Sequence, residues 1–562
     1  MKTTFINLVY DIVLCCAISL PSYSQSITGH LPKRIDSIFE RWNISTSPGC
    51  VIGVVRNDSL IFAKGYGSAN LEYEIPNTPS SLYHTASISK QFTAYAIVLL
   101  AKEGKLKLDD EVKTYLPWFP DFPEKITIHH LLIHTSGIRD QWQLLSIAGT
   151  RLDDVITQEH ILKIISAQQE LNARPGEIYN YCNSGYTLLA EIMRVITGKS
   201  LRAYTDSAIF KPLGMVSTHF HDNYKEIEKN RAYSYDRLDD TRFSNSILSY
   251  SNSGATSLFT NAYDLSKWVM NFYNPKVGEE EDLKTLTTRG KLNNGYELNY
   301  GLGVVVDQYK GWKQFSHSGG DAGYRTYLTI LPELKMGFYI FSNLSDFYQI
   351  AKLYEVIDFF VNEKEPGRQP IRPEHQDSSL AILKDNTAIQ HFPGHYISDD
   401  GVLFYFGFRD RVMFINSYLK NNYLVPGGVD TFSLLSSPET KFIFKLSGKD
   451  TLVEIRYPNR IRYLQKYTKA EHYADEVMMR YAGTYYSPEL DCSYTIQWRD
   501  RQLYLTHSKY LDSKLTLIGP DHIQSERWWM NHLVVLRNEK DQVAGFEINS
   551  GRVMHLQFNK LN

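Results

Sequence analysis

The segment Ser87-Ile88-Ser89-Lys90 offers a nucleophile and a base. Apolar residues at helical spacing follow it, so a helix is expected over 87–103, and Lys90 then lies one turn after Ser87 on the same face. A serine hydroxyl is a poor nucleophile until a base takes its proton, and a desolvated lysine with a lowered pKa is such a base. The pattern alone is weak, because an N-cap serine followed by a solvated lysine has the same residues.

A second candidate pair, Tyr181 and Asn183, lies in an aromatic segment that begins Arg174-Pro175-Gly176. A phenol held at the mouth of a site acts as a general base when a nearby ammonium lowers its pKa, and an amide binds both a lysine and a substrate carbonyl. The alternative is an aromatic loop that Asn183 caps. A helix is expected to follow over 186–197, with Gly198 ending it.

The third candidate is His317-Ser318-Gly319-Gly320, which precedes a strand expected over 326–331. Glycines allow a substrate backbone to approach the strand edge, and the Gly320 N–H can join the Ser87 N–H as an oxyanion hole. The alternative is a glycine-rich hairpin turn.

Helices and strands must both position these groups, because further strands are expected over 49–56, 60–64 and 336–341.

The amino-acid composition changes after residue 362. Three prolines with charged residues in 363–379 predict a linker over 363–385. Short aromatic and β-branched runs between turn residues follow the linker, which is typical of all-β modules.

The β-rich part contains an internal repeat. The segment 392–398, FPGHYIS, matches 481–487, YAGTYYS, at an offset of 89 residues, and three further short matches follow in the same order. Repetition in order predicts two copies of one module, over 386–468 and 469–562. Each copy is long enough to close a small antiparallel barrel.

Charge and composition exclude some classes of function. The 562 residues carry 60 Lys+Arg against 62 Asp+Glu, a net charge of −2, so nucleic acid is not expected as a main partner. A hydrophobic content of 43% excludes disorder on a large scale.

Neither a metal nor another cofactor is expected. Cys15 and Cys16 lie near the N-terminus and the other three cysteines are widely separated, so neither a disulfide framework nor a CxxC site is predicted. His130 and His134 are four residues apart on an expected helix, but no acidic ligand lies in the local pattern.

Residues 1–24 have the features of a secretory signal peptide. Lys2 precedes an apolar run over 5–20, and small residues at Ser22 and Ser24 suit cleavage near Ser24. The alternative is a short membrane anchor, although Asp11 interrupts the run and its length is marginal for a span. We therefore expect a periplasmic or secreted protein with no membrane span after signal removal.

Taken together, the SxxK of Ser87 and Lys90, the YxN of Tyr181 and Asn183 and the later His317-Ser318-Gly319 resemble the serine β-lactamase and penicillin-binding-protein superfamily. The branch in question holds class C β-lactamases, D,D-carboxypeptidases, D-aminopeptidases and related esterases. The stretches 126–137, 212–215 and 319–325 also look familial, so the resemblance covers about residues 30 to 362.

The resemblance implies an α+β catalytic domain over 25–362, with an antiparallel sheet flanked by helices, a helical lobe and the active site between them. Two small antiparallel barrels after it are similar to the arrangement in D-aminopeptidases of the family, where one barrel can reach towards the active site. Trp528 and Trp529 are candidates for such a contact, the alternative being packing within the barrel.

The resemblance also implies roles. Ser87 forms an acyl-enzyme, Lys90 and Tyr181 move protons, with Tyr181 as the base for deacylation, and the Ser87 and Gly320 amides hold the oxyanion. Asn183, His317 and Gly319 fall on the family's substrate-binding positions.

One departure bears on the substrate. His317 stands where most β-lactamases have lysine, so a fixed cation for a β-lactam carboxylate is missing unless Arg325 points into the cleft. We therefore expect a serine hydrolase of the D-amino-acid peptidase or esterase type, acting on a peptide, amide or ester substrate. The alternatives are a β-lactamase or transacylase with the same site and, from another class, a non-catalytic protein that binds cell wall or glycan. The sequence also allows a homo-oligomer.

Overall fold

The computed structural model describes residues 29–364 and 391–561, with short gaps at 399–401, 410–411, 418–419, 429, 435–436, 448–449, 458–459, 468–472 and 520. The predicted signal peptide and nearly all of the predicted linker lie outside the described residues. No helix within the described ranges is long and apolar enough to cross a bilayer.

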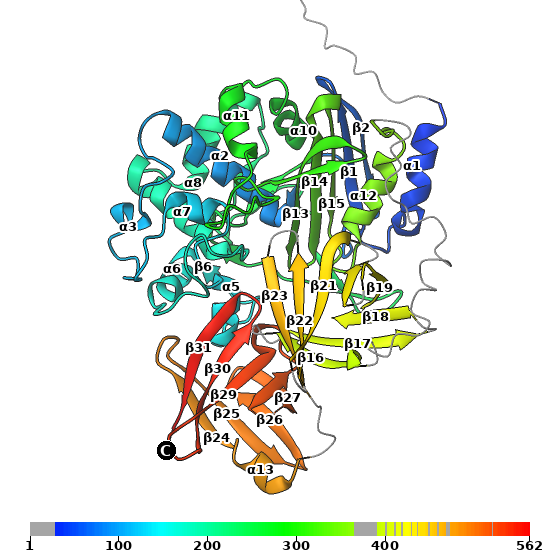
Figure 1. The fold of residues 1–562 in the computed structure, drawn as a ribbon. Helices are drawn as coiled ribbons and strands as arrows, with labels where there is room; N and C mark the ends of the chain where they lie inside the picture. Colours follow the sequence, from blue (N-terminus) through cyan, green and yellow to red (C-terminus); the bar gives the residue numbers. More distant parts are fainter. Residues whose placement is uncertain are drawn as a thin grey trace, which may run out of the picture.

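A six-stranded antiparallel sheet forms the centre of the first domain, in the order β12-β13-β14-β15-β1-β2 (Figure 1). Its strands are β1 (Cys50–Arg56), β2 (Ser59–Tyr66), β12 (Val305–Tyr309), β13 (Trp312–Asp321), β14 (Tyr324–Leu331) and β15 (Met336–Ser342). The four strands expected from the sequence are all present. β1 pairs with β15 from Cys50↔Ser342 to Arg56↔Met336, so the two ends of the domain meet in the middle of the sheet.

Both faces of this sheet are covered. Along β1, Cys50, Ile52 and Val54 pack in one apolar cluster with α1 (Leu31–Phe39) and α12 (Gln349–Ile357). Val51 and Val55 belong to the cluster of the opposite face, where α2 (Ser89–Lys102) and α10 (Ala262–Asn271) lie. A strand buried on both faces reads as a continuous apolar run, as Cys50 to Val55 does.

A helical lobe packs on the far side of α2. Its helices are α3 (Val112–Tyr115), α4 (Ile128–Leu132), α5 (Gln141–Ile147), α6 (Gln158–Ser166), α7 (Asn183–Thr197), α8 (Leu201–Thr205), α9 (Lys211–Leu213) and α11 (Glu280–Thr287). α2 is buried along almost its whole length, which is the pattern of a helix enclosed on all sides. The expected α+β catalytic domain is therefore confirmed.

Short strands connect the sheet to the lobe. β5 (Tyr83–His84), β11 (Leu258–Thr260) and β7 (His219–Phe220) form a three-stranded sheet in the order β5-β11-β7. The remaining two-stranded pairs are β3 (Ser68–Asn70) with β4 (Ile75–Pro76), β6 (Ile156–Thr157) with β10 (Tyr250–Ser251), and β8 (Tyr235–Arg237) with β9 (Phe243–Asn245).

Two closed eight-stranded antiparallel barrels follow, as the repeat predicts. The first contains β16 (Gly394–Ser398), β17 (Leu403–Arg409), β18 (Val412–Ser417), β19 (Lys420–Pro426), β20 (Thr431–Leu434), β21 (Ser437–Ser447), β22 (Asp450–Tyr457) and β23 (Arg460–Tyr467). The second contains β24 (Gly483–Ser487), β25 (Cys492–Arg499), β26 (Gln502–His507), β27 (Tyr510–Gly519), β28 (His522–Ser525), β29 (His532–Arg537), β30 (Val543–Ser550) and β31 (Val553–Lys560), after the short helix α13 (Asp475–Met479).

The two copies repeat one local device at the start of the barrel. Gly394 and Gly483 have φ angles of +144° and +149°, a region that favours glycine. The tyrosine two residues later bonds a backbone carbonyl four residues before it, Tyr396 to Phe392 at 2.8 Å and Tyr485 to Tyr481 at 2.7 Å. The repeated sequence therefore encodes a shared turn as well as shared strands.

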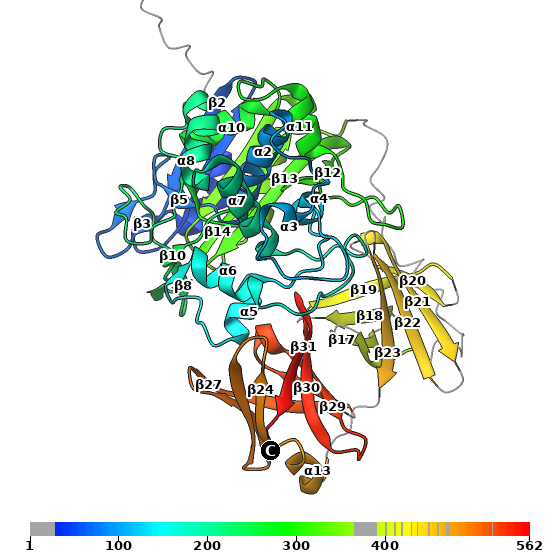
Figure 2. The same ribbon diagram turned by 90° about the vertical axis from the view of Figure 1, so that its left-hand side faces the viewer.

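The second barrel is joined to the catalytic domain, directly below α5 in Figure 2. Its apolar interior belongs to the same cluster as the helical lobe, whereas the described interior of the first barrel forms a cluster of its own. Arg139, with a fully buried side chain, crosses this interface and binds both carboxylate oxygens of Glu489 at 2.6 and 2.7 Å.

Candidate active site

Ser87 lies in a single 3-10 turn, Ala86–Ile88, between β5 and α2. The helix begins at Ser89, two residues later than the sequence predicts. Ala86, directly before the nucleophile, has φ of +49°, a conformation that non-glycine residues adopt rarely. Such local strain persists only where the surroundings hold it in place.

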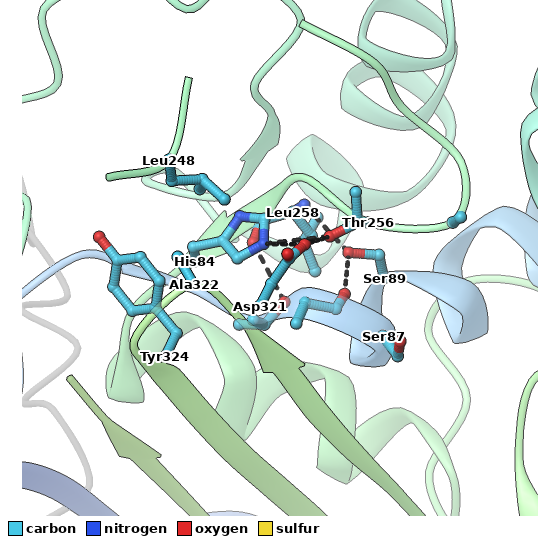
Figure 3. A network of polar contacts seen from close by, with 12 residues as sticks. His84, Ser87, Ser89, Leu248, Thr256, Leu258, Asp321, Ala322 and Tyr324 are labelled. Atoms are coloured by element: carbon cyan, nitrogen blue, oxygen red, sulfur yellow. Dashed lines mark hydrogen bonds and ion pairs between the residues drawn. The ribbon is translucent and has the colours of Figure 1, made fainter. Parts of the chain in front are cut away.

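Ser89 provides part of that support. Its hydroxyl donates to the Ala86 carbonyl at 2.5 Å and accepts from the Leu258 N–H at 3.0 Å, so it ties the turn to β11 (Figure 3). Next to these bonds, Asp321 Oδ2 accepts from Thr256 Oγ1 at 2.8 Å and lies 3.2 Å from His84 Nε2. The second serine of the SxxK segment thus positions the first.

The edge of β13 passes next to this turn. β12 pairs with β13 only from Tyr309↔Trp312 to Val305↔Ser316, so the strand from His317 onward lies beyond β12. A Cβ added at Gly319 would lie 2.3 Å from the Thr85 carbonyl oxygen and 2.2 Å from Thr326 Oγ1. Glycine is therefore required at 319 for β13 to approach the Ser87 turn.

Lys90 lies fully buried beside the serine. Its ammonium donates to Ser87 Oγ at 3.1 Å, to Asn183 Oδ1 at 2.8 Å and to the Ala255 carbonyl at 2.7 Å. Burial, and then the positive charge of Arg552, lower the pKa of Lys90 to about 7, against the raising effect of Asp140 and Asp321. Once it loses one proton, two N–H groups can stay with Asn183 and Ala255 while the lone pair faces Ser87, which is the arrangement of a general base.

Asn183 is the first residue of α7, which begins three residues earlier than predicted and ends at Gly198 as expected. Its backbone N–H and side-chain NH₂ both donate to Asp140 Oδ2 at 2.7 Å, which leaves Oδ1 for Lys90. Asp140 itself caps α5 through Trp142 N–H. Asp140 was not predicted as a site residue, because it lies 43 residues before Asn183 and no local motif joins the two.

Tyr181 stands over the same centre. Its ring centre lies 4.9 Å from Lys90 Nζ and 4.8 Å from the Arg552 guanidinium. Burial raises the pKa of the Tyr181 phenol, and the Ser87 side chain and Arg552 act in the opposite direction. The balance leaves the phenol protonated near neutral pH.

His317 belongs to a chain of hydrogen bonds, and a backbone amide at the other end of the chain fixes the direction of each bond. Cys182 N–H donates to His134 Nδ1 at 3.1 Å, so the neutral His134 carries its proton on Nε2 and faces Tyr300 OH at 3.2 Å. Tyr300 then donates to His317 Nε2 at 3.0 Å, and His317 Nδ1–H donates to the Ser318 carbonyl at 2.7 Å.

The same surroundings keep His317 neutral, because burial and the charge of Lys90 lower its pKa to about 3. His317, which stands where the resemblance implies a lysine, is therefore a neutral link in this chain of hydrogen bonds. His134, with φ of +59°, lies beyond the end of α4, while His130 bonds the Thr127 N–H of its own helix cap. The two histidines thus do not form the pair on one helix that their spacing suggested.

Arg325 is not the missing cation. It pairs with Gly320 across β13 and β14, but its Nη1 donates to the carbonyls of Ala322 at 2.9 Å and Tyr324 at 2.8 Å, and Arg325 is absent from the described residues that line the cavity. A Cβ at Gly320 would meet Arg325 atoms at 3.7 Å, which is ordinary contact.

The cation comes instead from the second barrel. Arg552 lies in the turn between β30 and β31 and extends over Tyr181, with Nη1 3.7 Å from Asp140 Oδ2. Gln143 holds this turn by accepting from Arg552 N–H at 2.9 Å and donating to Ser550 O at 2.6 Å. Asn172 donates to the Arg552 carbonyl at 2.8 Å.

These groups surround a cavity of about 620 Å³. Its lining residues come from the Ser87 turn, β13, the lobe and the second barrel, and they are Ser87, Asp140, Trp142, Gln143, Leu152, Tyr181, Asn183, Tyr250, Thr256, His317, Ser318, Gly320, Asp321, Trp528, Gly551 and Arg552. Of the two tryptophans considered in the sequence, Trp528 lines the cavity, whereas the Trp529 carbonyl accepts from Gln143 at 2.9 Å.

The family model described as Beta-lactamase matches residues 36–356, which is more than half of the chain. The protein belongs to the beta-lactamase family. Its members include serine hydrolases, and the assembled Ser87, Lys90, Tyr181 and Asn183 agree with that membership.

Curated relatives extend the similarity. Penicillin-binding protein 4* of Bacillus subtilis (strain 168) is 26% identical over 443 residues, covering 75% of this chain and 92% of the relative. Protein flp of Staphylococcus aureus (strain COL) is 29% identical over 353 residues, covering 60% of this chain and 68% of the relative.

Among solved structures, the octameric penicillin-binding protein homologue from Pyrococcus abyssi is similar with a TM-score of 0.53 and 24% identity. The match covers 78% of this chain and 100% of that chain. This likeness shows a shared fold.

Proposed function

We propose that this protein is an exported serine hydrolase that forms an acyl-enzyme on Ser87 and acts on a small peptide, amide or ester. The observation that carries the proposal is the 3.1 Å contact between Lys90 Nζ and Ser87 Oγ, with the pKa of Lys90 lowered to about 7. A neutral lysine this close can take the serine proton as the hydroxyl attacks a carbonyl.

In the first step Ser87 Oγ bonds to the substrate carbonyl carbon and its proton moves to Lys90. The carbonyl oxygen becomes an oxyanion, for which the N–H groups of Ser87 and Gly320 are the candidate donors. The bond to the leaving amine or alcohol then breaks, and that group takes a proton from the site.

Tyr181 is suited to deliver this proton. Its raised pKa keeps it a phenol, and its ring centre lies 4.9 Å from Lys90 Nζ, the group that takes the serine proton. In the second step water attacks the acyl-enzyme and gives its proton back through the same groups, so that Ser87 is released.

The charges in the cavity favour a zwitterionic or carboxylate-bearing substrate over a purely apolar one. Arg552 is the cation that a substrate carboxylate would meet, and Asp140 and Asp321 offer negative charge for an amine. A D-amino-acid peptide has both groups, a D-amino-acid amide has the amine, and the similarity to a penicillin-binding protein supports the peptide class.

Export is part of the proposal, since residues 1–24 have the features of a signal peptide. A hydrolase of short peptides outside the cytoplasm has cell-wall peptides within reach. Size-exclusion chromatography with light scattering tests whether copies of the chain assemble into a homo-oligomer.

The test is a panel of D-amino-acid amides, D-Ala-D-Ala peptides, short-chain esters and a chromogenic cephalosporin, assayed with wild type, Ser87→Ala and Lys90→Ala. We expect turnover of an amide, peptide or ester by wild type, a loss of at least about 10²-fold in both variants, and labelling of Ser87 by a fluorophosphonate. Label that persists in Ser87→Ala contradicts the proposal.

Two other outcomes identify the alternatives. A cephalosporin turned over faster than every peptide and ester would make the protein a β-lactamase. No turnover and no labelling across the panel would favour a protein that only binds cell wall or glycan. Product analysis with added amine or alcohol acceptors separates hydrolysis from acyl transfer.

A further inference from the structure

Three side chains away from the catalytic centre bring two ring nitrogens and a carboxylate together. His219, His221 and Glu228 place their ligand atoms within 4.8 Å of one another. His219 and His221 are two residues apart at β7, a spacing that directs both side chains to one side of an extended segment. Glu228 follows in the loop after it.

The carboxylate of Glu228 lies close to one nitrogen of each ring. Glu228 Oε1 lies 2.9 Å from His219 Nε2 and 3.4 Å from His221 Nδ1. Yet among the described residues, neither these two nitrogens nor His221 Nε2 has a hydrogen-bond partner. Buried polar atoms are nearly always paired, so orphaned ones call for an explanation.

The surroundings fix the positions of both rings. His219 stacks on Phe259 with an interplanar angle of 10°, and His221 packs on the same ring at 5.0 Å. The His221 side chain is only 4% exposed.

The other charged groups nearby act in both directions. Arg231 lies 5.1 Å from the centre of Phe259 and opposes a bound cation, while Glu226 and Asp222 bring negative charge. Both of these carboxylates are paired with Arg202, which leaves Glu228 as the acidic group next to the two rings.

We propose that His219, His221 and Glu228 bind one divalent transition-metal ion of the zinc class. Two imidazoles and a carboxylate are borderline ligands that suit Zn²⁺, whereas Ca²⁺ and Mg²⁺ prefer sites built from oxygen. His219 and Glu228 also line a cavity of about 710 Å³ that shares no lining residue with the catalytic cavity. This second cavity gives the ion access and leaves a fourth position for water.

A bound ion would stabilise the small sheet that leads into the Ser87 turn. β7 pairs with β11, and β11 pairs with β5, which runs into the Ser87 turn. The loop that carries Glu228 returns to the same sheet, where Leu82 N–H donates to Asn230 O at 2.8 Å. One ion would therefore tie this loop to β7, which β11 joins to the strand that precedes the Ser87 turn. The sequence did not reveal the site, because the histidine spacing matches no common zinc motif and Glu228 lies outside the pair.

The test uses the full-length protein, stripped with a chelator and titrated with Zn²⁺ against a chromophoric chelator, and with Co²⁺ for its absorption spectrum. We expect one ion per chain, a raised Tm, and the visible bands of four-coordinate cobalt. His219→Ala and Glu228→Gln should each weaken Zn²⁺ binding by more than about tenfold, the loss that even outer-shell partners cause.

A His30→Ala/His391→Ala variant is the matched control, since both histidines are exposed, and it should bind as wild type does. Glu228→Gln keeps the size of the side chain, and a circular-dichroism spectrum and unfolding transition equal to those of the metal-stripped wild type show that it is folded. Equal Zn²⁺ affinity in wild type and Glu228→Gln, or affinity that only the control variant loses, overturns the proposal.

Discussion

The guanidinium of Arg552 lies 4.8 Å from the centre of the Tyr181 ring. One of these residues belongs to the catalytic domain and the other to a turn of the second barrel. The contact makes the barrel part of the active site, and it places a cation where neutral His317 provides none.

Replacing Arg552 with alanine should therefore change selectivity more than overall activity. We expect kcat/KM for carboxylate-bearing substrates to fall about 10- to 100-fold, because the loss of one hydrogen bond to a charged group weakens binding by about that factor. The effect on neutral esters should be smaller. Because Arg552 lowers the pKa of Lys90, its removal should also move the pH profile to higher pH. Arg501→Ala, an exposed arginine of the same barrel, is the control. An equal loss on both substrate types would contradict the prediction.

Activity should rise with pH through the pKa of Lys90, which is about 7, because only the neutral amine accepts the serine proton. Initial rates between pH 5.5 and 9 test this expectation, and a rate that is flat from about pH 6 to 8 counts against Lys90 as the base.

The same shift has a consequence for stability. The unfolded chain keeps this proton up to its ordinary pKa of 10.5 and the folded chain loses it near 7, so the unfolded state binds more protons between the two. Lys90 should therefore make wild-type stability rise with pH in that window. Lys90→Met should lack this slope in denaturant titrations.

Asp140→Asn leaves one acceptor oxygen where the carboxylate has two, so the two hydrogen bonds of 2.7 Å from Asn183 and the bond from Trp142 N–H cannot all be kept. Asp140 also raises the pKa of Lys90, so its loss should lower that pKa. We expect reduced kcat with a pH profile shifted to lower pH, in the opposite direction to Arg552→Ala. A reduced kcat with no shift would mean that Asp140 acts only through the position of Asn183.

Gly319→Ala should displace the nucleophile turn, because the new Cβ would lie 2.3 Å from the Thr85 carbonyl oxygen. Overpacking of this kind costs about 1–3 kcal/mol, and activity should fall with it. Gly320→Ala is the matched control, since its Cβ meets nothing closer than 3.7 Å and the N–H is kept. Equal behaviour of the two variants in unfolding and kinetics would refute the close-approach argument.

Arg139→Met should loosen the second barrel, because Glu489 is left as an unpaired, nearly buried carboxylate. Breaking a buried pair on one side costs about 3–5 kcal/mol, whereas replacing both partners with apolar residues is often far cheaper. Limited proteolysis and denaturant unfolding of Arg139→Met and of Arg139→Met/Glu489→Leu measure the difference. Identical losses in the two would argue against the pair as the cause.

The sequence by itself determined the features that depend on local order. Ser87 and Lys90 are one helical turn apart, and the segment that forms β1 is a run of apolar residues. The repeated glycine and tyrosine predict two copies of one barrel. Helical spacing, burial on both faces of a sheet, and a turn that requires glycine are all set by near neighbours, so they are visible in a chain read alone.

Only the tertiary structure decided which distant groups meet. Arg552 rather than Arg325 reaches the cavity, because Arg325 bonds the carbonyls of its own turn while Gln143 and Asn172 hold the Arg552 turn against the lobe. The proton on His317 is set by the Cys182 amide through His134 and Tyr300, and Glu228 meets two histidines from another segment. Such contacts depend on how whole elements pack, and no local pattern of residues encodes that.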